Sequence, residues 1–192
     1  MKFIKTDISG VFILEPKIYN DERGYFIESF NQKEFDEFLG YRVNFCQDNE
    51  SKSSFGVLRG LHFQKPPYEQ SKLVRVITGE VLDVAVDLRE GSPTYGKSVS
   101  ITLSEENKKQ IFIPKGFAHG FVVLSEEAVF SYKVDNFYNQ KSESGILFSD
   151  PELGIDWKVT KEQMTLSSKD KALPLLCEMP EIFTYKAYFN LG

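Results

Sequence analysis

Two histidines are the candidates for proton transfer in this sequence of 192 residues. His62 lies in the run VLRGLHFQ (57–64), and His119 lies in the run PKGFAHGF (114–121). Imidazole is the only side chain whose unperturbed pKa favours proton transfer near neutral pH. The sequence therefore offers a short list of general bases.

The competing use of these histidines is metal binding. A zinc or iron site needs three or four ligands, usually a cluster of His, Cys and carboxylate side chains. Gln64, and not a third histidine, stands two residues after His62, and no cysteine cluster supplies the missing ligand. We therefore predict no metal and no cofactor.

Lys72 and Tyr132 are further candidates, because each shares its parity with apolar residues of an expected strand. Lys72 alternates with Val74, and Tyr132 alternates with Phe130. An inward tyrosine is often an ordinary core residue with a bonded hydroxyl, whereas an inward ammonium group needs a partner or a task. We expect Lys72 to point inward.

The segment 57–64 poses a geometric question. Strict alternation places Arg59 and His62 on opposite faces of a strand. Both enter one pocket only if Gly60 permits a bulge, and the alternative is a surface arginine and a core histidine. Two more segments, 21–28 (DERGYFIE) and 47–53 (QDNESKS), have the mixed donors and acceptors of ligand-reading loops, but ordinary turns share that composition.

Period-two alternation dominates the chain and predicts strands. In the segment 80–88, one face is apolar and the other carries Asp83, Ala85 and Asp87. Strands are expected at 11–15, 24–30, 43–48, 56–64, 72–78, 80–88, 97–103, 110–113, 120–125 and 128–136. Short strands with frequent turn residues predict a sandwich, barrel or jelly roll.

One helix is clearly predicted. Asn31 caps it, Gly40 ends it, and Phe35, Phe38 and Leu39 form its apolar stripe. No repeat or linker divides the chain, so one domain over 1–192 is expected.

The carboxyl-terminal part carries two weaker signals. A second short helix is expected near 160–165. The tail from Glu181 to Gly192 is aromatic, and we expect it to pack on the domain or on a neighbouring subunit. Its aromatic residues are Phe183, Tyr185, Tyr188 and Phe189.

Composition excludes several classes of protein. Hydrophobic residues make up 41% and charged residues 27%, as in soluble globular proteins. The net charge of −5 leaves no basic footprint for nucleic acid. Cys46 and Cys177 make no disulfide framework, the first residues do not form a signal peptide, and no apolar stretch could span a bilayer. We predict a cytoplasmic protein without membrane or nucleic-acid partners.

Together these segments resemble the dTDP-4-dehydrorhamnose 3,5-epimerase family of cupin-fold enzymes. The resemblance covers nearly the whole chain and is densest at DERG (21–24), QDN (47–49), 57–64, KLVR (72–75) and 113–121. It implies an all-β fold, a double-stranded jelly-roll (cupin) barrel with a few short helices.

The resemblance implies a cofactor-independent isomerase acting on dTDP-4-dehydro-6-deoxy-D-glucose, a dTDP-linked 4-keto-6-deoxy sugar. Inversion at C3 and C5 through enolates would give dTDP-4-dehydro-L-rhamnose for dTDP-L-rhamnose biosynthesis. By family similarity His62 would be the base and Asp170 would orient it. Tyr132 would protonate the opposite face, and Lys72 would stabilise the enolate oxygen.

The resemblance also implies a substrate-binding set and a homodimer. One subunit's amino-terminal strands would border the other's pocket, so that some of Arg23, Phe26 and Glu28 act across the interface. The matched binding positions are Arg23, Phe26, Glu28, Gln47, Asn49, Arg59, His119, Tyr138, Glu143 and Lys169.

Three alternatives to the double epimerase remain at the level of sequence. An epimerase acting at C3 or C5 only would keep much of the same machinery. A silent nucleotide-sugar-binding cupin would lack the base, the acid or the Asp170 partner. A metal cupin would need more histidines than this chain has.

Overall fold

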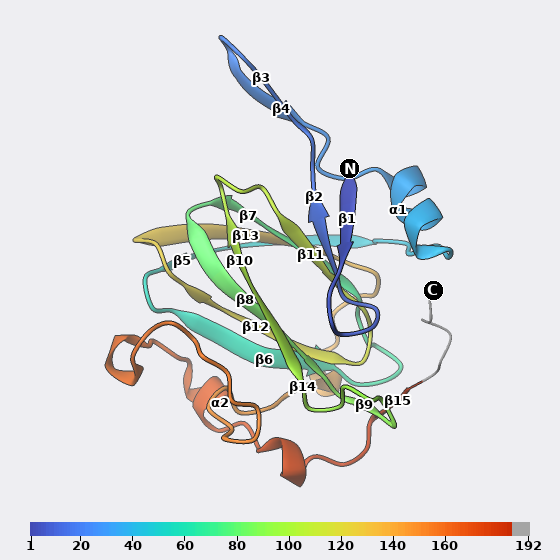
Figure 1. Cartoon of the computed structure of the whole chain (residues 1–192). Helices are drawn as coiled ribbons and strands as arrows, with labels where there is room; N and C mark the ends of the chain where they lie inside the picture. The colour runs from blue at the N-terminus through green and yellow to red at the C-terminus, as the bar shows by residue number, and fades with distance from the viewer. Residues whose placement is uncertain (186–192) are drawn as a thin grey trace.

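Two antiparallel sheets face one another and form a jelly roll in the computed structural model, which describes residues 1–185 (Figure 1). The six-stranded sheet has the order β1 (Lys2–Lys5), β2 (Phe12–Glu15), β11 (Gln110–Ile113), β7 (Lys72–Thr78), β13 (Glu127–Val134) and β5 (Gln47–Ser54). The five-stranded sheet has the order β10 (Ser98–Ser104), β8 (Glu80–Asp87), β12 (Phe117–Val123), β6 (Leu58–Gln64) and β14 (Glu143–Gly145). The predicted all-β jelly roll is confirmed.

Smaller elements surround the two sheets. Two strand pairs lie outside them, the antiparallel hairpin of β3 (Ile18–Asp21) and β4 (Gly24–Ile27), and the parallel pair of β9 (Arg89–Glu90) and β15 (Phe183–Thr184). The helical elements are α1 (Gln32–Leu39), α2 (Ser168–Lys171) and the 3₁₀ turns η1 (Gln140–Ser142), η2 (Lys161–Gln163) and η3 (Leu176–Glu178).

The five-stranded sheet is buried on both faces, and β8 shows why. Leu82 and Val84 face outward and pack under the carboxyl-terminal segment around Trp157. Ala85 faces inward, between the sheets, against Phe130 of the opposite sheet. The acidic face that alternation predicts for this strand is therefore an interior face, and Asp83 is fully buried in it.

The predicted helix is confirmed as α1. The Asn31 side chain accepts hydrogen bonds from two backbone N–H groups of the first turn, and Gly40 closes the helix in the left-handed conformation with φ 74°. Phe35 and Leu39 are buried against the outer face of the six-stranded sheet. This helix covers the sheet face opposite to the interior.

The segment 43–54 differs from its prediction. A strand was expected at 43–48 and a loop-like segment at 47–53, but β5 begins at Gln47 and ends at Ser54. Its inward side chains, such as Asn49 and Ser51, line a polar cavity, so the strand has no apolar face. Hydrophobic alternation cannot detect such a strand.

Other differences are shorter. The expected helix near 160–165 is one 3₁₀ turn, η2, and α2 and the strands β1 and β3 were not predicted. Phe183 of the carboxyl-terminal tail packs on the domain through an edge contact with Phe63. Tyr188 and Phe189 lie outside the described residues.

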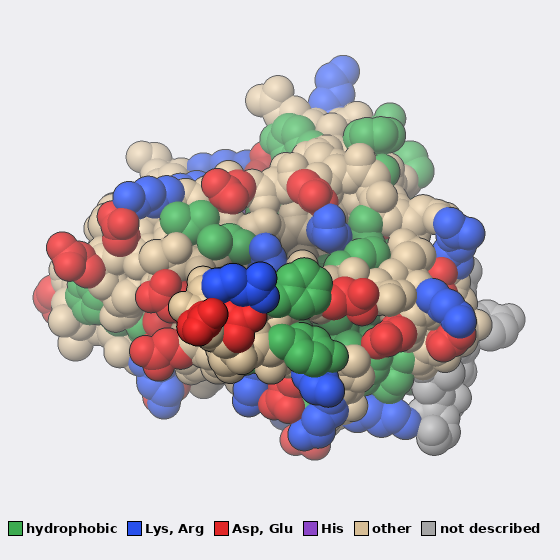
Figure 2. Space-filling view, turned by 90° about the horizontal axis from the view of Figure 1, so that it is seen from above, with side chains coloured by type: hydrophobic (Ala, Val, Ile, Leu, Met, Phe, Trp, Pro, Cys, Tyr) green, Lys and Arg blue, Asp and Glu red, His purple; other side chains and the backbone are tan. Residues whose placement is uncertain are grey.

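The β3–β4 hairpin projects from the body of the molecule (Figure 1). Its aromatic side chains are exposed, with Tyr25 at 56% and Phe26 at 67%. Figure 2 looks onto this end and shows hydrophobic side chains standing among charged ones. Such a concentration of exposed aromatic surface is typical of a contact site.

No helix within residues 1–185 is long and apolar enough to cross a membrane. The cytoplasmic location stays a prediction.

Candidate active site

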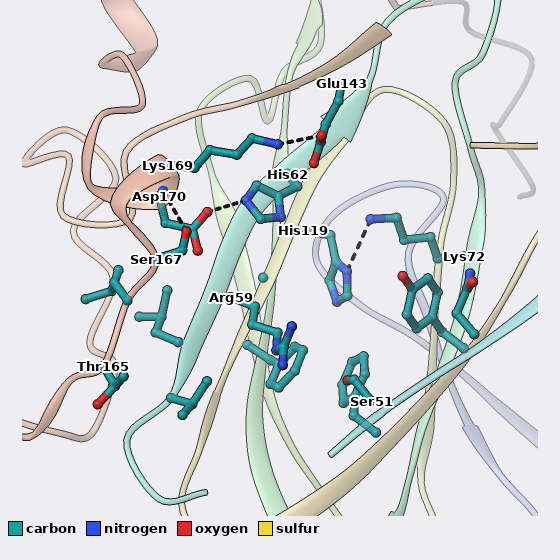
Figure 3. Close-up of a pocket in the computed structure, with 18 of the residues that line it drawn as sticks. Ser51, Arg59, His62, Lys72, His119, Glu143, Thr165, Ser167, Lys169 and Asp170 are labelled. Carbon is teal, nitrogen blue, oxygen red and sulfur yellow. Dashed lines mark hydrogen bonds and ion pairs between the residues drawn. The ribbon is translucent and has the colours of Figure 1, made fainter. Parts of the chain in front are cut away.

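A cavity of about 700 Å³ lies between the two sheets. Strands of both sheets line it, and the segment that leads into α2 closes one side (Figure 3). The predicted residues that line it are Asn49, Arg59, His62, Lys72, His119, Tyr132, Glu143, Lys169 and Asp170. The structure thus brings together four predicted catalytic residues and five predicted binding residues.

Arg59 and His62 both reach this cavity because the pairing of β6 with β12 is irregular. The register shifts between His119 and Phe121, as a bulge requires. Gly60 has φ 134°, and a Cβ atom there would lie 2.5 Å from the Cα of Gly120. Only glycine fits this approach, so the predicted role of Gly60 is confirmed.

His62 is held by a carboxylate from a distant part of the chain. Its Nε2 lies 2.6 Å from Oδ1 of Asp170 (Figure 3). Ser167 holds the backbone of Asp170, because its hydroxyl oxygen accepts a hydrogen bond from the Asp170 backbone N–H at 3.1 Å. Burial lowers the pKa of His62, and Asp170 opposes that shift. The neutral imidazole therefore presents Nδ1 as a proton acceptor at neutral pH.

Lys72 and His119 form a second contact in the cavity. Lys72 Nζ lies 3.4 Å from Nδ1 of His119, and His119 Nε2 lies 2.9 Å from Oδ2 of Asp83. Burial lowers the pKa of Lys72 to about 8, opposed by the carboxylates of Asp83 and Glu143. Burial also lowers the pKa of His119. The cavity thus holds an ammonium group close to its titration range.

Tyr132 lines the cavity from β13, on the sheet opposite to His62. Burial raises its pKa, so the phenol keeps its proton through the neutral range. The hydroxyl has no hydrogen-bond partner among residues 1–185, so it is free to donate to a ligand. A donor and an acceptor of protons thus stand on opposite walls.

The rim of the cavity is a charged cluster of Tyr138, Glu143 and Lys169. Lys169 Nζ lies 2.5 Å from Glu143 Oε2, and the Tyr138 hydroxyl donates to the same oxygen at 2.8 Å. Burial pushes the pKa of Glu143 upward, but the hydrogen bonds from Lys169 and Tyr138 and the charge of Lys169 together outweigh it, and the pKa is lowered. Tyr138 is half exposed beside the entrance, where a planar ligand could stack on it.

Two polar contacts order the wall near β5. The Arg59 guanidinium donates to Ser53 Oγ at 3.1 and 3.2 Å, which leaves part of its donor fork for a ligand. Gln47 Nε2 donates to Asn49 Oδ1 at 2.7 Å, so Gln47 reaches the cavity through Asn49. Both contacts join β5 to the cavity.

Five predicted residues do not line this chain's own cavity: Gln47 and Tyr138 only contact residues that line it, and three others lie away from it. Arg23 and Phe26 lie on the projecting hairpin, where Arg23 pairs with Asp21 at 2.6 Å. Glu28 follows the hairpin and accepts a hydrogen bond from Asn31. None of the three lines the cavity.

Asp83 was predicted to lie on the polar face of the strand at 80–88, but no role was predicted for it. The available signal was its parity with Ala85, which pairs with His119 across β8 and β12. Ser167 was also missed, because a single capping serine has no distinctive spacing. Within residues 1–185, no three His, Cys, Asp or Glu side chains come together as metal ligands.

Comparison with known proteins identifies the family. A family model described as dTDP-4-dehydrorhamnose 3,5-epimerase matches residues 5–178. A dTDP-4-dehydrorhamnose 3,5-epimerase of Shigella flexneri is 59% identical over 170 residues, covering 88% of this chain and 93% of the relative.

Two solved structures extend the comparison. A dTDP-6-deoxy-D-glucose-3,5-epimerase of Legionella pneumophila, solved with dTDP-4-keto-L-rhamnose, is 52% identical with a TM-score of 0.93, covering 97% of this chain and 99% of that one. A 3′-monoepimerase of Streptomyces bikiniensis, solved with dTDP-quinovose, is 30% identical with a TM-score of 0.85, covering 91% and 87%. The whole cavity lies within the matched region, and the chain belongs to the dTDP-4-dehydrorhamnose 3,5-epimerase family.

Proposed function

We propose that this chain converts dTDP-4-dehydro-6-deoxy-D-glucose to dTDP-4-dehydro-L-rhamnose, with His62 as the base. The proposed substrate rests on the 52% identity, over 97% of the chain, to a protein whose structure was solved with dTDP-4-keto-L-rhamnose. Isomerase activity follows from membership of the family. The geometry of the cavity supports a role for each catalytic residue.

The base step uses the open nitrogen of His62. The C4 ketone acidifies the protons on C3 and C5, and Nδ1 takes one of them while Nε2 stays bonded to Asp170. The electrons of the C–H bond form an enolate whose charge gathers on the C4 oxygen. Asp170 fixes the tautomer and stabilises the imidazolium that forms.

The enolate needs a donor where its charge develops. Lys72 comes from the sheet opposite to His62 and lines the same cavity. A charge-assisted hydrogen bond from its ammonium group to the C4 oxygen lowers the barrier to enolate formation. A compact ammonium group suits this position because it can follow the oxygen through both epimerisations.

Inversion requires a proton from the other face of the sugar. Tyr132 stands on the wall opposite to His62 and holds its proton at neutral pH. Transfer from its hydroxyl to the carbon completes the inversion, after which solvent restores the phenol and removes the proton from His62. The same two groups serve C3 and C5 once the ring turns in the cavity.

The nucleotide would lie towards the rim. Arg59 supplies donors for the pyrophosphate or sugar, and Tyr138 supplies a surface for stacking on the thymine. His119 would meet the same part of the ligand with its ring, because its N–H is directed to Asp83. Gln47 and Asn49 supply amides for reading the base. Binding must break the contacts of Glu143 with Tyr138 or Lys169, which frees these side chains for the ligand.

A homodimer completes the proposal. Arg23, Phe26 and Glu28 match substrate-binding positions of the family, yet they lie outside this chain's own cavity. The exposed aromatic hairpin that carries two of them would reach a second copy and border its cavity. Mixing an Arg23→Ala chain with a His62→Asn chain should then restore activity, since one site of the mixed dimer has both residues. Mixed dimers without restored activity would place Arg23 in cis.

Proton NMR of the substrate with the purified protein in D₂O tests the reaction. We expect deuterium at both C3 and C5, together with product. Exchange at one carbon alone would show a mono-epimerase, as in the Streptomyces bikiniensis relative. No exchange at either carbon would contradict the proposed substrate or the catalytic role of the cavity.

A further inference from the structure

Asp83 is a buried carboxylate that the proposed reaction leaves without a task. It lies in the middle of β8 with no exposed surface. Oδ2 lies 2.9 Å from Nε2 of His119, whereas Oδ1 is buried without any hydrogen-bond partner among the described residues. A buried carboxylate with an unpaired oxygen is costly to keep, so a purely structural role explains it poorly.

The carboxylate begins a chain of contacts that ends at Lys72. A neutral imidazole has one N–H donor and one lone pair. Asp83 draws the proton of His119 to Nε2, which leaves the lone pair on Nδ1. That nitrogen faces the Lys72 ammonium group at 3.4 Å (Figure 3). Lys72 can therefore donate a hydrogen bond to Nδ1 of His119 only while Asp83 keeps the His119 proton on Nε2.

Charge points to the same conclusion. The groups that act on Lys72 are the carboxylates of Asp83 on β8 and Glu143 on β14, and the imidazoles of His119 on β12 and His62 on β6. Glu143 is already paired with Lys169 at the rim. Among residues 1–185, no lysine or arginine lies within 4 Å of the Asp83 carboxylate, whose one ion-pair partner is the neutral His119 ring. Asp83 is thus the principal buried countercharge for Lys72.

We propose that Asp83 is a positioning residue for Lys72: it orients His119 to receive the ammonium group and supplies the buried charge that keeps that group protonated. This inference rests on the proposed function, in which Lys72 stabilises the enolate. Asp83 touches neither the substrate nor a reacting atom. It acts through His119 and through its field.

The test compares Asp83→Asn with Asp87→Asn. Both change a fully buried carboxylate on the same strand and the same face, but Asp87 pairs with Arg89, whereas Asp83 contacts His119. The rate of C3 and C5 exchange is measured from roughly pH 6 to 10. In the unchanged protein, loss of the Lys72 ammonium should end activity above a pH of about 8.

The expected result is a shift of this alkaline limit to lower pH in Asp83→Asn alone. The ratio of the rate at pH 8 to that at pH 7 should fall by about threefold to fivefold, because the limit follows one titrating group whose protonated fraction drops at most tenfold per pH unit. The KM should change less than kcat, since the ammonium group acts on the enolate. An alkaline limit that stays in place in the folded variant, together with an unmoved Lys72 titration, would overturn the inference.

A second measurement needs no activity. The ¹³Cε resonance of Lys72, assigned by its loss in Lys72→Arg, reports the titration of the amine directly. In the ligand-free unchanged protein it should titrate near 8, and at lower pH in Asp83→Asn. A Lys72 titration that does not move to lower pH in Asp83→Asn, or in Asp83→Ser if Asp83→Asn does not fold, would overturn the inference.

The two measurements separate the inference from the proposed function. If the Lys72 titration does not move in folded Asp83→Asn, Asp83 does not hold the ammonium group, and the role of Lys72 is untouched. If the titration moves but the alkaline limit does not, Lys72 does not stabilise the enolate, and the proposed mechanism fails at that residue.

Discussion

The two histidines of the cavity are cross-strand partners on β6 and β12, and each has its Nε2 against an aspartate. The distances are similar, 2.6 Å to Asp170 and 2.9 Å to Asp83. Their surroundings differ. The His62 side chain is 29% exposed to the cavity, and the His119 side chain is 6% exposed.

The difference lies at the other nitrogen. Nδ1 of His119 faces Lys72, whereas Nδ1 of His62 has no hydrogen-bond partner among residues 1–185. The aspartates also come from different places, since Asp83 lies on the neighbouring strand and Asp170 lies on a short helix 108 residues along the chain. The same His–Asp contact therefore makes a base in one case and an anchor for a cation in the other.

Replacing His62 by Asn should have the largest effect on the rate. Loss of the base should lower exchange at C3 and C5 by about two to four orders of magnitude. Binding of dTDP, followed by calorimetry, should stay close to that of the unchanged protein, because the proposed nucleotide contacts are made elsewhere. Near-normal turnover would show that His62 is not the base, and the proposed difference in role between His62 and His119 would be wrong.

Replacing Tyr132 by Phe should separate the two faces of the reaction. Product formation should fall by about 100-fold or more, because the second proton has no donor. Deuterium should still enter the substrate without inversion, since His62 can return a solvent-derived proton to its own face. The matched control is Tyr95→Phe, which makes the same change outside the cavity. Equal losses of exchange and of product would contradict the division of roles.

The pH dependence of the unchanged enzyme should show which group limits each side. His62 must be neutral, and its lowered pKa puts the acidic limit below 6.5. Lys72 must be charged, which puts the alkaline limit near 8, while Tyr132 keeps its proton because its pKa is raised above 10. Beyond each limit the rate should fall about tenfold per pH unit. Full activity well above the alkaline limit would exclude the ammonium of Lys72 from catalysis.

The free energy of unfolding should also distinguish Asp83 from Asp170, although this effect is smaller than the effects on rate. Asp83→Ala removes the acceptor of the buried His119 N–H and the buried countercharge of Lys72, which should cost ~2–4 kcal/mol. Asp170→Ala leaves His62 with access to cavity water and should cost ~1 kcal/mol. Thermal unfolding at pH 7 measures both, with a difference of a few degrees expected. A larger loss from Asp170→Ala would reverse the assignment of anchor and base.

How much of this could be predicted depended on the kind of signal. The strands with an apolar face, such as β8, and the capped helix α1 follow from local pattern. β5 did not, because its inward residues serve a polar cavity. The pairing of His62 with Asp170 spans 108 residues, so only family resemblance, and no local spacing, pointed to it.

Asp83 shows the complementary limit. Its parity was evident, but alternation alone does not tell whether a polar face meets water or a second sheet. The answer required the outer cover of the five-stranded sheet, which comes from residues beyond 145. The inward position of Lys72 was predictable, because Lys72 and Val74 lie on the same face of one strand and that face is apolar.

The most direct test of the central distinction is ¹⁵N NMR of the two imidazoles in the ligand-free protein at about pH 7. Two histidines give a simple spectrum, and His62→Asn assigns it. We predict that both rings are neutral and carry their proton on Nε2, with the free Nδ1 of His62 available to accept a proton and that of His119 shifted by the Lys72 ammonium group. A proton on Nδ1 of His62, or a charged ring there, would leave no base in the cavity and would contradict the account.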